Sequence, residues 1–128
     1  MPKSPSGPAP ARCMLCPRQC GADRRAAAGA CGAGGVLKVA RAAAHFGEEP
    51  CISGSRGSGT VFFSHCPLSC CYCQNWRISA GGLGREISTG RLAGIFLELA
   101  AQGVHNLNLV TATQWLPWIL PALHEAWE

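Results

Sequence analysis

The pattern of hydrophobic and polar residues changes near residue 60. From there on, short runs of β-branched and aromatic residues are separated by a longer segment whose apolar residues recur every three or four positions. Residues 60–63 form a run of the first kind, which is typical of a buried parallel strand. Residues 107–111 form a second run, interrupted by the polar Asn108. These segments predict a mixed α/β region over residues 60–128.

The clearest helical pattern lies between these two strands. Its apolar residues fall at i, i+3, i+4 and i+7 and form one stripe: Leu92, Ile95, Phe96 and Leu99. Ser88 or Thr89 can cap the start of this helix. Gly103 suits the position just beyond its end. The pattern therefore predicts an amphipathic helix that connects the two strands.

Weaker patterns predict two further elements. Residues 116–127 favour a helix in which Pro117 is tolerated in the first turn, whereas Pro121 should delay or kink it. Residues 36–41 favour a short strand after a glycine pair. Residues 53–59 are rich in glycine and serine and suggest a flexible approach to the next strand.

A cysteine-rich segment, residues 64–75, follows the strand at residues 60–63. Cys66, Cys70 and Cys73 are spaced as C-x3-C-x2-C. Three thiolates this close can reach one metal centre, yet they leave one iron of a four-iron cluster without a protein ligand. An open iron can bind a small molecule, whereas a fourth cysteine favours plain electron transfer. A zinc knuckle is the alternative, because clustered cysteines often bind zinc.

This spacing, with Tyr72 directly before the last cysteine, resembles the radical S-adenosylmethionine (radical SAM) superfamily. The resemblance implies that Cys66, Cys70 and Cys73 ligate a [4Fe-4S] cluster whose fourth iron chelates S-adenosylmethionine. Reductive cleavage of that cofactor gives a 5′-deoxyadenosyl radical, which abstracts hydrogen from a substrate. The resemblance also implies that Tyr72 lies near the adenine. Cys71 has no counterpart, and we interpret it as a non-ligand.

The flanking segments are similar to one subgroup, the proteins related to pyruvate formate-lyase activating enzyme. The matching segments are residues 13–21, 47–54, 57–63, 73–75 and 106–111. The chain resembles the N-terminal portion of such a protein. The resemblance implies a glycyl-radical enzyme as protein substrate and an electron donor such as flavodoxin or ferredoxin.

The residues after the second strand differ from the superfamily. A Gly-Gly-Glu-type segment there usually holds the amino group of S-adenosylmethionine, but residues 111–114 are Thr-Ala-Thr-Gln. The subgroup also departs from that pattern. The hydroxyls of Thr111 and Thr113 are the candidate replacements for this contact.

The expected fold is α/β, a partial radical SAM (β/α) barrel truncated to about two βα units and preceded by a Cys-rich loop segment. Six such units need roughly 180 residues. We therefore expect the 128-residue chain to assemble a cluster but to bind S-adenosylmethionine weakly or not at all by itself, unless another chain supplies the missing units. The expected divisions are a disordered lead-in (1–11), a Cys-rich segment (12–59) and the start of the core domain (60–128).

A second set of cysteines lies near the N-terminus. Its spacing is C-x2-C-x3-C-x10-C, formed by Cys13, Cys16, Cys20 and Cys31. Four thiolates form a closed set, which suits a structural or electron-relay centre. The metal is either zinc or the iron of an auxiliary cluster, and unliganded buried thiols are the alternative. We interpret Cys51 as an ordinary thiol and His45 as a surface or packing histidine.

Charge is distributed unevenly along the chain. Residues 1–59 carry eight cationic and three acidic side chains, a net charge of +5, whereas residues 60–128 have a net charge of −1. No basic helix face with interleaved aromatic residues is present, so nucleic acid is not an expected partner. Four arginines lie among the cysteines, where they can offset thiolate charge: Arg12, Arg18, Arg24 and Arg25.

Cysteine usage and hydropathy bear on the compartment. Nine cysteines cannot all form disulfides within the chain, and the first ten residues lack the apolar core of a signal peptide. No run of 18 apolar residues is present, so we expect no membrane span. The interpretation of the cysteines as cluster ligands implies a reducing, cytoplasmic location.

Three hypotheses follow for the function. The first is a radical SAM enzyme, and the second is a non-catalytic zinc-binding module or inactive fragment. The third is an electron-transfer protein, which would need Cys51 or Cys71 as a fourth cluster ligand.

Overall fold

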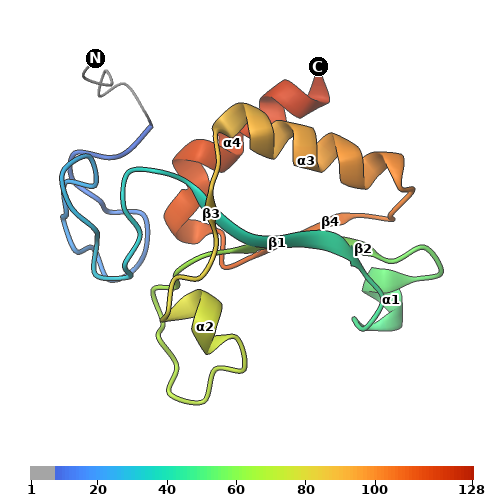
Figure 1. Ribbon diagram of the computed structural model, residues 1–128, viewed down its shortest axis with the longest axis horizontal. Coiled ribbons are helices and arrows are strands. Elements are labelled where there is room, and N and C mark those ends of the chain that lie inside the picture. Colours follow the sequence, from blue (N-terminus) through green and yellow to red (C-terminus); the bar gives the residue numbers. More distant parts are fainter. Residues whose placement is uncertain (1–7) are drawn as a thin grey trace.

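The computed structural model describes residues 8–128 and contains one four-stranded sheet (Figure 1). The strand order is β3-β1-β2-β4. The strands are β1 (Lys38–His45), β2 (Ser58–Phe63), β3 (Arg85–Glu86) and β4 (Leu107–Val110). Strand β1 pairs antiparallel with both β2 and β3, whereas β2 and β4 are parallel. The expected parallel pair is therefore present, at one side of a mixed sheet.

Two long helices cover one side of this sheet (Figure 1). They are α3 (Thr89–Ala101) and α4 (Leu116–Trp127), and a 3-10 turn, η1 (Thr113–Trp115), precedes α4. Short helices α1 (Pro50–Ser53) and α2 (Trp76–Ser79) lie in the connections. The α/β class predicted from the sequence is confirmed.

Helix α3 forms as its pattern predicts. Ser88 caps it by accepting a hydrogen bond from the backbone N–H of Arg91 at 3.0 Å. Gly103 follows the helix with a φ of 79°, in the left-handed region that glycine tolerates. The apolar stripe is buried, apart from the half-buried Ile95. This helix carries the chain from the region of β3 to β4, which lies parallel to β2.

The core lies between the sheet and the two long helices. Strand β2 contributes Val61 and Phe63, α3 contributes Leu92 and Phe96, and all four are buried. Trp115 from η1 joins the same cluster, together with Trp118 and Ile119 from α4. The segment after β4 is therefore packed against β2. This packing holds the carboxyl ends of both parallel strands in place.

Three details differ from the sequence prediction. The strand expected over residues 36–41 is Lys38–His45, because an alanine-rich stretch that is weak in strand propensity pairs with β2. The two-residue strand β3 was not predicted. Helix α4 starts at Leu116 and continues through Pro121, which is exposed, so water can satisfy the carbonyl group that loses its partner. The expected delay of this helix does not occur.

The sheet crosses one of the expected divisions of the chain. Strands β1 and β2 pair across the proposed boundary at residue 60. Residues 1–7 of the expected lead-in lie outside the described part of the chain. Within residues 8–11, Ala9 packs against the core and the Pro10 carbonyl accepts a hydrogen bond from Arg24 N at 3.0 Å. No helix of the described residues combines the length and apolar character that a bilayer crossing requires.

Candidate metal-binding loops

The segment of residues 64–75, called the second cysteine loop from here on, begins where β2 ends. Its first residue, Ser64, is fully buried and is held on two sides. The backbone N–H of Ser64 donates to Lys38 O at 3.1 Å, and its hydroxyl donates to Leu83 O at 2.8 Å. The loop therefore leaves the sheet from a fixed point at the carboxyl end of β2.

Residues after β4 also hold the start of the second cysteine loop. The buried amide of Gln114 donates to Ser64 O at 3.2 Å and to His65 O at 2.9 Å. The indole N–H of Trp115 donates to Ser64 O at 2.8 Å. Thr111, a candidate cofactor contact, donates its hydroxyl to Phe63 O at 3.0 Å. The 111–115 segment thus positions the backbone that leads to Cys66.

His65 lies immediately before the first candidate ligand. Its φ is 69°, and its ring is close to both Gly32 and Gly82. Burial lowers the pKa of His65, and the nearby charges of Lys38 and Arg24 lower it further. We infer that this imidazole is neutral at physiological pH. Local sequence patterns do not predict the roles of His65, Gln114 and Trp115, because the hydrogen bonds that unite them join residues about fifty positions apart.

The thiols of the second cysteine loop lie at the surface or are half-buried. Cys66 and Cys73 are half-buried, whereas Cys70 and Cys71 are exposed. The backbone N–H of Cys73 donates to Cys70 O at 3.2 Å, and the Cys73 thiol is 3.3 Å from the hydroxyl of Ser79 in α2. Tyr72 is 88% exposed. The structure places the three predicted ligands on one short loop.

Residues 12–35 form the first cysteine loop. Cys13 is buried, and its backbone exchanges hydrogen bonds of 2.9 Å with Gly21 and Ala22. Hydrogen bonds from the backbone of Ala30, and then of Ala22, lower the pKa of the Cys20 thiol, and a weaker one from the Cys13 side chain adds to them. Ala22 therefore lies beside both Cys13 and Cys20.

The remaining two cysteines of this set border the same region. Cys31 accepts a hydrogen bond from Ala33 N at 3.4 Å, while Cys16 is half-buried and its carbonyl accepts from Gln19 N. Within residues 8–128, no three side chains of His, Cys, Asp or Glu are gathered closely enough to hold a metal ion. The cysteines of each set share a loop but do not adopt a ligand geometry. Such geometry commonly forms only when the metal binds.

The two cysteine loops contact each other, and cations line the contact. Arg18 donates to Pro67 O, which follows Cys66 in the chain. Lys38 donates to Gly82 O at 2.6 Å beside the His65 ring. Arg25 instead turns to Asp23 at 2.9 Å in an exposed pair. Of these two arginines, Arg18 therefore reaches the second cysteine loop and Arg25 does not.

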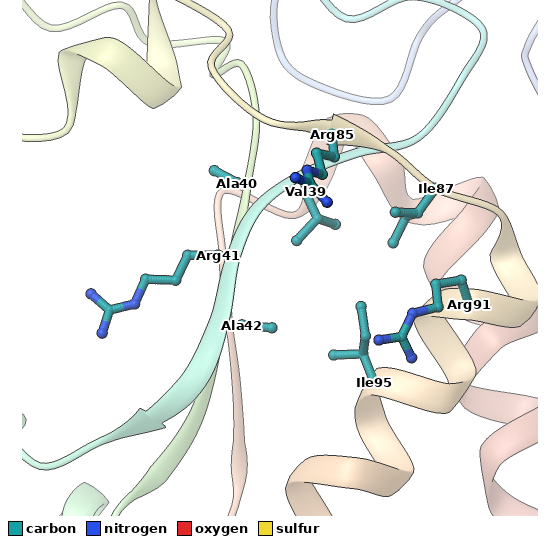
Figure 2. A pocket seen from close by; sticks show the side chains of 8 residues that line it. All are labelled: Val39, Ala40, Arg41, Ala42, Arg85, Ile87, Arg91 and Ile95. Carbon is teal, nitrogen blue, oxygen red and sulfur yellow. The ribbon is translucent and has the colours of Figure 1, made fainter.

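The other candidate residues and grooves lie apart from these loops. Cys51 is exposed on α1, and His45 is 3.7 Å from Glu48. A groove of about 250 Å³ between β1, β3 and α3 contains Arg85 and Arg91, and Arg41 extends to the other side of β1 (Figure 2). Arg91 is already paired with Glu98 at 2.8 Å. No cysteine lines this groove, so it adds nothing to the candidate metal sites.

No protein-family model, curated protein or solved structure matches this chain. The interpretation of the two loops therefore depends on their own residues and contacts. The radical SAM resemblance stays a prediction from the cysteine spacing and the flanking segments.

We expect Gly82→Ala to displace His65 and to destabilise the fold. Gly82 has a φ of 65°, and a methyl group there would lie 2.4 Å from Cε1 of His65. Strain and overpacking should lower the free energy of unfolding by about 2 kcal/mol. Urea denaturation measures this, with Gly34→Ala as the control, since nothing lies within 4 Å of a methyl group there. Equal denaturation midpoints for the two variants would contradict the close approach at His65.

Proposed function

We propose that this chain is a radical SAM protein similar to glycyl-radical activating enzymes. Cys66, Cys70 and Cys73 would hold a [4Fe-4S] cluster that reductively cleaves S-adenosylmethionine to a 5′-deoxyadenosyl radical for hydrogen abstraction. The single observation that carries this proposal is the C-x3-C-x2-C loop at the carboxyl end of a buried parallel strand. Reactive groups in β/α folds gather at that end of the strands.

The donor set fits a cluster with one open iron. Three thiolates would ligate three irons and leave the fourth for the cofactor. Cys70 is exposed and Cys66 is half-buried, so a cluster can be inserted without opening the core. Lys38 donates to Gly82 O beside the ring of His65, the residue before Cys66, and a positive charge there favours a negatively charged thiolate centre.

Other residues of the chain would position this centre. Gln114 and Trp115 fix the backbone before Cys66 through their hydrogen bonds to Ser64 O and His65 O. The ring of Tyr72 is almost fully exposed and is free to stack on a planar base. These contacts would hold the first ligand rigidly and leave the outer part of the loop accessible to a cofactor.

The finer description of the fold belongs to the same proposal. Strands β2 and β4 are parallel neighbours, and α3 lies in the connection between them. That arrangement supports a partial radical SAM barrel of about two βα units. The antiparallel partner β1 and the first cysteine loop would then be an N-terminal addition to the barrel.

The partners and further cofactors follow the resemblance. The substrate would be a glycyl-radical enzyme, the electron donor would resemble flavodoxin or ferredoxin, and the setting would be the cytoplasm. The first cysteine loop would hold zinc or a second iron–sulfur cluster. Its four-cysteine set leaves no open coordination position, which suits a structural or electron-relay role.

A non-catalytic zinc-binding module is the second candidate function, because one chain carries two cysteine sets of short spacing. Anaerobic reconstitution with iron and sulfide distinguishes the two. We expect brown protein with the visible absorption of an iron–sulfur cluster. A colourless protein that takes up only zinc would favour the zinc module and contradict the enzyme proposal.

A further inference from the structure

Arg24 is a fully buried cation in the first cysteine loop. Its side chain is 1% exposed, and its guanidinium carbon lies 4.9 Å from the ring centroids of both Trp115 and Trp118. Nε donates to Gly34 O at 3.1 Å, and Nη1 donates to Gln114 O. Nη2 has no hydrogen-bond partner among the described residues.

Within residues 8–128, no carboxylate pairs with this guanidinium. Burying a charge is costly unless an opposite charge accompanies it. The side chain of the neighbouring acid, Asp23, is 43% exposed and is paired with Arg25. Aromatic rings and carbonyl oxygens offer only partial negative charge, and a bridging water would satisfy Nη2 without supplying charge.

One contact of Arg24 can become an anion. Nη1 lies 4.0 Å from the Sγ atom of Cys13, which is itself buried. Among the hydrogen-bond partners of Arg24 in residues 8–128, only this thiol can carry a full negative charge. Binding a divalent metal to thiolates leaves a net negative centre, because four thiolates outweigh two positive charges.

We propose that Arg24 is the buried counter-charge of an anionic metal–thiolate centre formed by Cys13 with Cys16, Cys20 and Cys31. The proposal rests on the metal site of the first cysteine loop and not on the cluster of the second. Arg24 is a positioning residue, since it contacts a ligand of the metal rather than the metal itself. Groups of this kind commonly tune metal affinity.

The same arginine connects the two loops. Its Nη1 donates to the carbonyl of Gln114, whose side chain donates to Ser64 O and His65 O just before Cys66. A metal centre at Cys13 would stabilise Arg24 in its present position. Occupation of the first loop would therefore favour the contacts that hold the start of the second loop.

The test is zinc affinity, measured by competition with a chromophoric chelator. The full chain carries Cys70→Ser throughout, so that the second loop cannot assemble its proposed site. We expect Arg24→Met to weaken zinc binding by about 10- to 100-fold. Arg24→Lys, which keeps the positive charge, should weaken zinc binding by a smaller factor. Arg25→Met is the matched control, because that exposed side chain faces Asp23, and it should bind zinc within about twofold of the parent.

Thermal unfolding of the same proteins separates charge from packing. Without metal, Arg24→Met should change the melting temperature only slightly, because the loss of the hydrogen bonds to Gly34 O and Gln114 O offsets the removal of an unbalanced buried charge. With zinc, the variant should gain less stability than the parent. If Arg24→Met lowered the melting temperature equally with and without zinc, or left the zinc affinity unchanged, Arg24 would be only a packing residue and the proposal would be overturned. Absence of zinc binding by the parent would also overturn it, whereas the cluster of the second loop would still be tested by iron reconstitution.

Discussion

Cys70→Ser is expected to abolish assembly of the proposed four-iron cluster. The thiolate of Cys70 would be the middle of three ligands on the second cysteine loop, and two remaining thiolates cannot hold a cluster with one iron already open. Iron and sulfide content after anaerobic reconstitution should each fall by about four per chain relative to the unsubstituted protein. A cluster in the first cysteine loop, if present, would be retained and would set the baseline.

Cys71→Ser is the matched control for this substitution. Cys71 is adjacent to Cys70 in the chain and is equally exposed, but it lies outside the C-x3-C-x2-C spacing. We expect it to keep its iron and sulfide. Loss of the cluster in both variants would mean that Cys71 is a fourth ligand, which favours an electron-transfer protein. Retention in both would contradict the ligand assignment.

Trp115→Ala should destabilise the protein more than Gly82→Ala. The side chain is fully buried, packs at 5.2 Å against the ring of Trp118 and donates to Ser64 O. Truncating a buried tryptophan lowers the free energy of unfolding by about 3–5 kcal/mol. Urea denaturation measures this change, with one slope of the free energy of unfolding against urea concentration used for both proteins.

Two further variants show where that energy comes from. Trp127→Ala, at a side chain that is 92% exposed, should change the free energy of unfolding by less than about 0.5 kcal/mol. Trp115→Phe keeps an aromatic ring but loses the donor to Ser64 O, and it should cost about 1–3 kcal/mol. Similar effects for the alanine variants of Trp115 and Trp127 would contradict the described burial.

Much of the local structure could be predicted because local signals agree with the fold. The helix Thr89–Ala101 combines an N-cap, an apolar stripe and a terminal glycine, and each is observed. The helix Leu116–Trp127 has the predicted bounds. Strand β1 was predicted only in part, because Ala42, Ala43 and Ala44 become a strand through pairing with β2 rather than through their own propensity.

The surroundings of the candidate site could not be predicted in the same way. The position of the second cysteine loop after a strand could be predicted, because the hydrophobic run of residues 60–63 directly precedes the cysteines. The contacts of Arg24 with Gln114 and Trp115 join segments about ninety residues apart, and no local pattern specifies them. If these loops bind metal as proposed, their thiols need not converge beforehand, because metal binding would supply the free energy that gathers them.

The proposed function is tested most directly by electron paramagnetic resonance of the reduced, reconstituted protein, with and without S-adenosylmethionine. We expect a [4Fe-4S] signal that requires Cys66, Cys70 and Cys73. Because this chain should bind S-adenosylmethionine weakly or not at all by itself, the signal should change only at a high concentration of the cofactor or stay the same. A change in the signal on adding the cofactor would establish the open iron. Absence of any cluster signal, with stoichiometric zinc bound instead, would contradict the proposed function and identify the chain as a zinc-binding module.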